Sequence, residues 1–120
     1  MFPDPGERRR HVRLDSHIPM RYRKIETKPQ ELKGSLMKNL SIGGVRMTIY
    51  EFLPLNSKLA MEIPLMFGGK PVQGACRVAW VKKIAFGEQY DVGVEFVNLN
   101  QGDQTQIAKF IFDKSVERIL

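Results

Sequence analysis

Tyr90-Asp91-Val92-Gly93-Val94-Glu95-Phe96 alternates apolar residues with polar or small ones at every second position. Because successive side chains of a β-strand point to opposite faces of the sheet, this period of two predicts a half-buried strand. Comparable alternation recurs upstream, in the ranges 18–23, 32–38, 45–49, 58–63 and 72–82. Six strands in succession predict a mostly β protein, built as a six-stranded antiparallel β-barrel.

The same alternation predicts which residues share a face of each strand. In the first strand these are Ile18, Met20 and Tyr22, in the second Leu32, Gly34 and Leu36, and in the fifth Cys76, Val78 and Trp80.

The period changes after Asn98, where a helix is expected. Asn100 is a good N-cap, with Asp103 three residues later. Apolar residues then recur at helical spacing: Ile107, Ala108, Ile111, Phe112, Val116 and Ile119. A C-terminal α-helix should therefore pack one apolar stripe against the barrel.

The bulk properties are those of one ordinary domain. The chain has 120 residues, of which 42% are hydrophobic and 27% charged, and that length suits a single core. Residues 1–14 are expected to form a flexible basic arm and residues 15–120 the barrel domain. No apolar run reaches the length of a membrane span, and one cysteine cannot form an internal disulfide, so a cytoplasmic protein without membrane insertion is expected.

Positive charge gathers near the beginning of the chain. The formal net charge is +6, and residues 1–24 hold seven basic residues against three acidic ones, a net charge of +4. The segment Arg8-Arg9-Arg10-His11-Val12-Arg13 carries most of it. A focused positive field raises the local concentration of anions, which favours a phosphate-bearing ligand. The alternative is that the arginines form a solvated tail.

Asn39-Leu40-Ser41-Ile42-Gly43-Gly44 lies between the second and third predicted strands and is expected to form an interstrand corner (residues 39–44). Asn39 carries an acceptor and a donor for a base edge, and Ser41 a hydroxyl for a phosphate or a base. Gly43 and Gly44 permit close approach of the backbone to a ligand. In the alternative, the Asn39 and Ser41 side chains bond to the local backbone and stabilise the turn.

Arg9 and Arg13, followed by Asn39, Ser41 and Gly44, resemble the two-part signature of PilZ domains, Arg-x-x-x-Arg and Asn/Asp-x-Ser-x-x-Gly. Asn39 stands where aspartate is commoner in the family. The order of predicted elements from about residue 8 to about residue 112 is also similar to the family's plan. The resemblance implies a PilZ-like barrel that is a bacterial receptor for the second messenger cyclic di-GMP.

The resemblance also implies a mechanism and further contacts. Arg9 and Arg13 would hold the ligand while the arm folds over it, with Trp80 and Gly93 as candidate wall residues. In this family, an arginine at the position of Arg8, just before the Arg-x-x-x-Arg pair, tends to accompany the binding of two stacked cyclic di-GMP molecules and not of one. The alternatives are that Arg8 points into solvent, that Trp80 belongs to the core or to a contact between barrel and helix, and that Gly93 marks a bend in the barrel.

Two other functions compete with the receptor. One is a small basic barrel that binds RNA or single-stranded DNA, which would present aromatic and basic residues together on a strand face. The other is a PilZ-like adaptor that has lost its ligand and acts through protein contacts. Asp15-Ser16-His17 holds the residue types of a catalytic triad, but neighbours in a strand point in different directions. The sequence therefore predicts no enzyme, cofactor or metal site, and leaves the downstream partner unknown.

Overall fold

The computed structural model describes residues 14–26, 28, 30–65, 69–84 and 87–119, with side chains from residue 17 to residue 114 within these ranges. The elements are β1 (Leu14–Lys24), β2 (Lys33–Leu40), β3 (Gly44–Ile49), β4 (Lys58–Ile63), β5 (Val72–Lys83), β6 (Tyr90–Asn98) and α1 (Gln101–Ile119).

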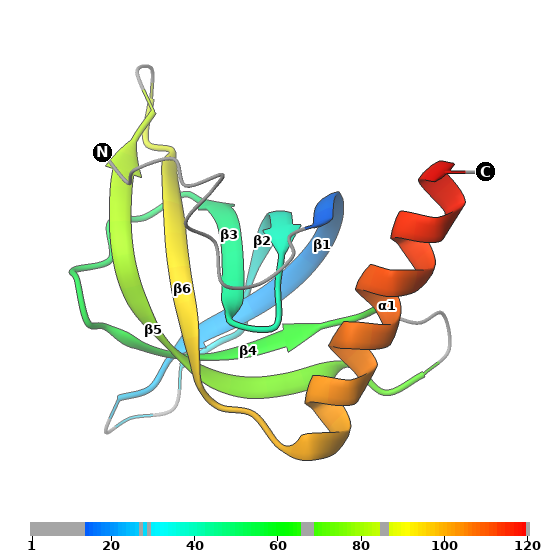
Figure 1. Ribbon diagram of the computed structural model, residues 1–120. Coiled ribbons are helices and arrows are strands. Elements are labelled where there is room, and N and C mark those ends of the chain that lie inside the picture. Colours follow the sequence, from blue (N-terminus) through cyan, green and yellow to red (C-terminus); the bar gives the residue numbers. More distant parts are fainter. Residues whose placement is uncertain (1–13, 27, 29, 66–68, 85–86, 120) are drawn as a thin grey trace.

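The strands form a closed barrel in the order β1-β2-β3-β6-β5-β4 (Figure 1). All six neighbouring pairs are antiparallel. The predicted six-stranded antiparallel β-barrel with a C-terminal helix is therefore confirmed. Closure gives each strand a hydrogen-bonded neighbour on both sides for at least part of its length.

One hydrophobic core fills the barrel. Met20 and Tyr22 are buried on β1, as the alternation predicts. The other inward residues of the strands are Met37, Leu40, Val45, Met47, Ile49, Leu59, Met61, Ile63, Val72, Cys76, Val78, Val92 and Val94. Leu53, in the loop between β3 and β4, is also fully buried.

The predicted shared face of the second strand turns out to face solvent. Leu32 precedes β2, Leu36 is 37% exposed, and Gly34 is exposed, whereas Met37 and Leu40 are buried. A β-bulge explains how Met37 and Leu40 both point inward although they are three residues apart. The pairing of β2 with β3 shifts between Met37 and Asn39, so that Lys38 is the additional residue and the alternation changes phase.

A second bulge places Trp80 on a different face from the one predicted. The pairing of β5 with β6 shifts between Val78 and Trp80. Val78 pairs with the buried Val94, while Trp80 pairs with Gly93, whose neighbours Val92 and Val94 point into the core. Trp80 therefore lies on the outer face of the barrel, opposite to Val78, and the prediction that Cys76, Val78 and Trp80 share one face is wrong.

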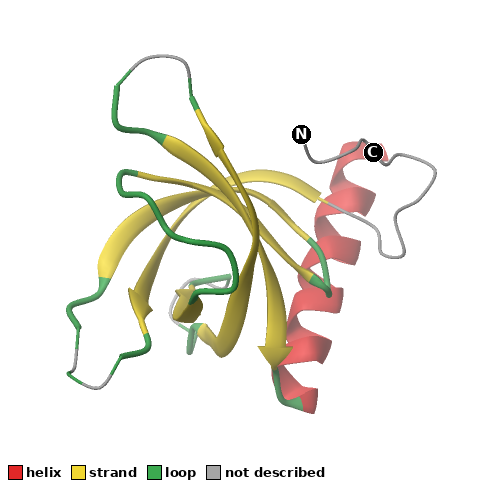
Figure 2. Ribbon diagram, turned by 90° about the vertical axis from the view of Figure 1, so that its left-hand side faces the viewer, coloured by secondary structure: helices red, strands yellow, loops and turns green. Residues whose placement is uncertain are grey.

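The helix lies alongside the barrel, where it packs against β5 and β1 (Figure 2). Asn100 is its N-cap as predicted, because the backbone N–H of Asp103 donates to Asn100 Oδ1 at 2.7 Å. Ile107 and Ile111 are buried, but Ala108 is exposed and Phe112 is 67% exposed, so the stripe is narrower than predicted. The side chains of Val116 and Ile119 lie outside the described residues. Within the described chain, no helix has the length and apolar character needed to cross a membrane.

Candidate ligand-binding site

The corner lies beside the point where the chain enters the barrel. Residues 41–43 connect β2 to β3, and the last residues of β2 pair with the first residues of β1, Leu40 with Leu14 and Asn39 with Asp15. Two segments that are some 25 residues apart in the sequence therefore meet at one edge of the barrel. The covalent bond from Leu14 back to Arg13 joins the basic arm to this edge.

Ser41 holds the corner in shape. Its hydroxyl oxygen accepts hydrogen bonds from the backbone N–H groups of Gly43 and Gly44, both at 3.2 Å. Its own backbone N–H donates to the carbonyl of Gly44 at 2.9 Å. The turn-stabilising role that the sequence allowed for Ser41 is thus observed. These contacts fix the position of the Ser41 hydroxyl within the corner.

Gly44 has a steric role that the sequence did not predict. A Cβ added here would overlap the backbone carbonyl oxygen of Val94 and approach Glu95 Cα to 3.2 Å. Its φ angle is not in the left-handed region, so space and not backbone freedom requires a glycine. The backbone of Gly43 is bound to β6 as well, because its carbonyl accepts from the N–H of Phe96 at 2.9 Å.

Four residues form a line across the outer face of the barrel, which we call the outer row: Asn39, Arg46, Gly93 and Trp80. They pair in that order on β2, β3, β6 and β5. Neighbouring strands are about 4.8 Å apart, so the row spans roughly 15 Å. Asn39 is only 8% exposed. The structure thus brings three of the predicted residues, Asn39, Gly93 and Trp80, into one line.

Trp80 and Gly93 are in direct contact. A Cβ added at Gly93 would overlap Nε1 and Cε2 of the Trp80 indole. The indole therefore lies over the backbone of β6, and Gly93 is required because the ring occupies the space of a side chain. Of the sequence alternatives for Trp80, the core position is wrong, and Gly93 accommodates a ring instead of marking only a bend.

A cluster of charged residues that the sequence did not single out lies next to the outer row. Arg46 Nη2 donates to Asp91 Oδ2 at 2.9 Å, and Lys38 Nζ lies 3.3 Å from Asp91 Oδ1. Thr48 Oγ1 donates to the same Oδ1 at 3.2 Å. Burial alone would raise the pKa of Asp91, but the contacts with Arg46 and Lys38 outweigh it and hold that pKa below its ordinary value. Asp91 is therefore ionised at neutral pH.

The three predicted arginines, Arg8, Arg9 and Arg13, lie outside the described residues. Their contacts with the corner stay predictions. Cys76 is fully buried on β5, and burial raises the pKa of its thiol to about 12, which leaves it uncharged and protected from reaction.

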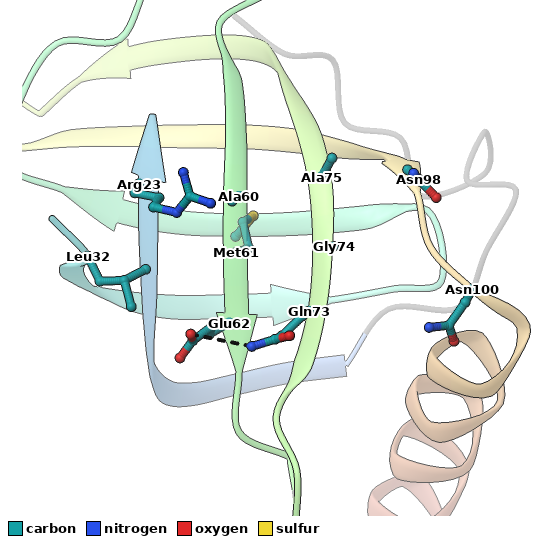
Figure 3. A pocket seen from close by; sticks show the side chains of 10 residues that line it. All are labelled: Arg23, Leu32, Ala60, Met61, Glu62, Gln73, Gly74, Ala75, Asn98 and Asn100. Carbon is teal, nitrogen blue, oxygen red and sulfur yellow. Dashed lines mark hydrogen bonds between the residues drawn. The ribbon is translucent and has the colours of Figure 1, made fainter. Parts of the chain in front are cut away.

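A pocket of about 360 Å³ lies elsewhere, along β1, β4 and β5 (Figure 3). Across it, Gln73 Nε2 donates to Glu62 Oε2 at 3.5 Å. The residues that line it are Arg23, Leu32, Ala60, Met61, Glu62, Gln73, Gly74, Ala75, Asn98 and Asn100. None of the predicted site residues is among them, so this pocket and the outer row are separate features. Within the described residues, no group of acidic, histidine or cysteine side chains is arranged to hold a metal ion.

Comparison with known families decides the classification. The family model described as PilZ domain matches residues 7–113, which includes the arginine segment, the corner and the outer row. The chain belongs to the PilZ domain family. Comparison with curated protein sequences finds no significant match.

Solved PilZ structures share this fold at low sequence identity. The PilZ domain of YcgR from Escherichia coli, solved with c-di-GMP, superposes with a TM-score of 0.70 at 16% identity, over 93% of this chain and 95% of that one. The inhibitor of motility MotI (DgrA) from Bacillus subtilis gives a TM-score of 0.77 at 18% identity, over 92% of this chain and 52% of that one. The K. pneumonia MrkH–c-di-GMP complex gives 0.71 at 17% identity, over 93% and 53%.

This PilZ chain therefore spans about half the length of MotI and of MrkH. At these identities the likeness establishes the fold.

Proposed function

We propose that this PilZ domain is a bacterial, cytoplasmic receptor for cyclic di-GMP and that it signals through ligand binding and not through catalysis. The observation that carries the proposal is the convergence of Asn39 and Ser41 with the start of β1 at one edge of the barrel. The segment with Arg9 and Arg13 precedes β1 directly and so joins the barrel at this edge. PilZ structures of YcgR and MrkH with c-di-GMP give independent support.

The chemistry of the ligand matches the residue types at this edge. A cyclic dinucleotide has two phosphates and two guanines. Arginine pairs with phosphate oxygens or with the O6 and N7 acceptors of guanine, and it stacks on aromatic planes. Asn39 and Ser41 add shorter polar groups, and the Trp80 indole offers a flat surface on the outer face. We assign these residues, with Gly43 and Gly44 as the backbone of the corner, to the ligand site.

In the proposed mechanism, the arm that precedes β1 closes over the ligand when Arg9 and Arg13 engage it. Ligand binding then selects one arm position and presents a changed surface to a downstream partner. Arg8 supplies an additional guanidinium, which offsets part of the repulsion among the four phosphate charges of two stacked ligands.

Titration calorimetry with cyclic di-GMP tests the receptor function. We expect saturable binding at about two ligands per chain, with no comparable binding of a short single-stranded RNA. The affinity for cyclic di-GMP should change only moderately between about 50 and about 200 mM salt, whereas RNA binding would fall about a thousandfold or more. Tight RNA binding with that salt dependence would favour the nucleic-acid alternative. Binding of neither ligand would favour the adaptor, and saturation at one ligand would refute the role of Arg8.

Hydrogen exchange tests the closure of the arm. Residues 1–13 are rich in charge, proline and glycine, so their amides are expected to exchange rapidly without ligand and slowly with saturating cyclic di-GMP. The amides of β3 serve as the internal reference, since the barrel ladder protects them in both states. Equally rapid exchange of the arm in both states would contradict closure while leaving binding intact.

A further inference from the structure

Arg46 is the second member of the outer row. Successive side chains of β3 point to opposite faces, and those of Val45 and Met47 are buried in the barrel. The Arg46 side chain between them therefore points outward. Arg46 pairs with Asn39 on one side and with Gly93 on the other. Trp80 lies over Gly93. A ligand that touches both Asn39 and Trp80 must therefore pass over Arg46.

The charge around Arg46 favours an anion or a hydrogen-bond acceptor. Asp91 is the one acidic side chain that contacts it among the described residues, and that carboxylate is shared with Lys38. Two cations around one carboxylate leave a net charge of +1 at this point of the outer face. The Asp91 side chain is 9% exposed whereas that of Arg46 is 40% exposed, so the cationic group faces solvent and the anionic group does not.

The guanidinium of Arg46 is held in place and retains donors. Its contact with Asp91 uses Nη2. Nε is buried and has no hydrogen-bond partner among the described residues. A guanidinium has five N–H donors in a planar fork, so the outward edge can still donate to an acceptor. The ion pair with Asp91 removes much of the side-chain freedom that binding would otherwise have to restrict.

We propose that Arg46 is a further ligand-contacting residue of the site, which donates to an acceptor oxygen or nitrogen of the cyclic dinucleotide between the corner and Trp80. The inference rests on the proposed function. Two acceptors of the ligand have the required chemistry, a phosphate oxygen and the O6/N7 edge of guanine.

Calorimetric titration of Arg46→Met and Arg46→Lys with cyclic di-GMP tests the proposal. Losing a charge-assisted hydrogen bond should weaken binding about 10- to 100-fold in Arg46→Met. Arg46→Lys keeps the charge and the ion pair with Asp91 but lacks the planar fork, so it should weaken binding about 3- to 10-fold. Urea unfolding of each variant shows whether the barrel is intact.

Arg21→Met is the matched control. Arg21 also lies on a strand and is paired with a carboxylate, Glu62 Oε1 at 2.7 Å, but it is opposite Gly34, far along β1 from the corner. Its affinity should stay within about twofold of the parent, since exposed ion pairs contribute little. Loss in Arg46→Met no larger than in Arg21→Met would overturn the proposal while the receptor function stands. If the parent itself does not bind cyclic di-GMP, both fail.

Cyclic di-AMP identifies which acceptor Arg46 contacts, because adenine carries an amino group where guanine carries O6. A proportional loss for both dinucleotides in Arg46→Met assigns the contact to a phosphate or to N7, which both bases carry. A loss confined to cyclic di-GMP assigns it to the guanine edge. Either result supports the contact.

Discussion

Gly44→Ala is expected to lower the free energy of unfolding of the barrel by about 3 kcal/mol, the upper range for overpacking of a tight site. The added Cβ would overlap the carbonyl oxygen of Val94 and lie 3.0 Å from the carbonyl carbon. Both atoms belong to the backbone of β6, which is paired with β3 on one side and β5 on the other. The strand cannot move away without breaking ladder hydrogen bonds.

Urea unfolding, followed by the fluorescence of the single tryptophan, Trp80, measures this effect. Gly34→Ala is the control, because Gly34 lies on the neighbouring strand β2 and no atom beyond its chain neighbours lies within 4 Å of an added Cβ. We expect Gly34→Ala to unfold within about 0.5 kcal/mol of the parent. Equal stability of the two variants would show that a side chain at position 44 can be accommodated and that a glycine is not required there.

The second large effect is expected in binding. Arg9→Ala and Arg13→Ala should each weaken cyclic di-GMP binding by about 2–4 kcal/mol, because each would remove a charge-assisted contact of the proposed site. The stability of the barrel should barely change, since both residues precede β1. Calorimetric titration at fixed ionic strength measures the affinity.

Arg10→Ala separates specific contact from general attraction. Arg10 lies between the two motif arginines and contributes the same charge to the arm, but it is not part of the Arg-x-x-x-Arg pattern. We expect its replacement to cost less than about 1 kcal/mol, through the loss of long-range attraction alone. If all three variants lost affinity equally, the arm would act only through its net charge, and the assignment of Arg9 and Arg13 would be wrong.

Much of the fold was predictable because local patterns and global structure agree. The alternation in β1, β3, β4 and β6 places the same residues inward that the closed barrel buries, for example Met20, Met47 and Val92. The N-cap at Asn100 was predictable for a similar reason, since its hydrogen bond to Asp103 lies within one helical turn. The corner motif also indicated its place, between β2 and β3.

Trp80 and the second strand were predicted on the wrong face because a β-bulge leaves no clear mark in the alternation. One additional residue in β5 turns every later side chain of that strand to the opposite face of the sheet. Lys38 has the same effect in β2. Whether a strand carries a bulge depends on its partner's register. Signals that reveal it, such as a glycine opposite a tryptophan, become visible only once the strands are paired.

By itself the sequence determined a barrel with a helix, a cluster of arginines ahead of the first strand, and a corner with short polar side chains, because each of these depends on neighbours along the chain. Only the tertiary structure decided that Asn39, Arg46, Gly93 and Trp80 form one row. It also decided that Arg46 and Asp91, 45 residues apart, form an ion pair. The physical reason is that closure of the barrel sets the register among distant strands, and that register is a property of the packed core rather than of any one segment.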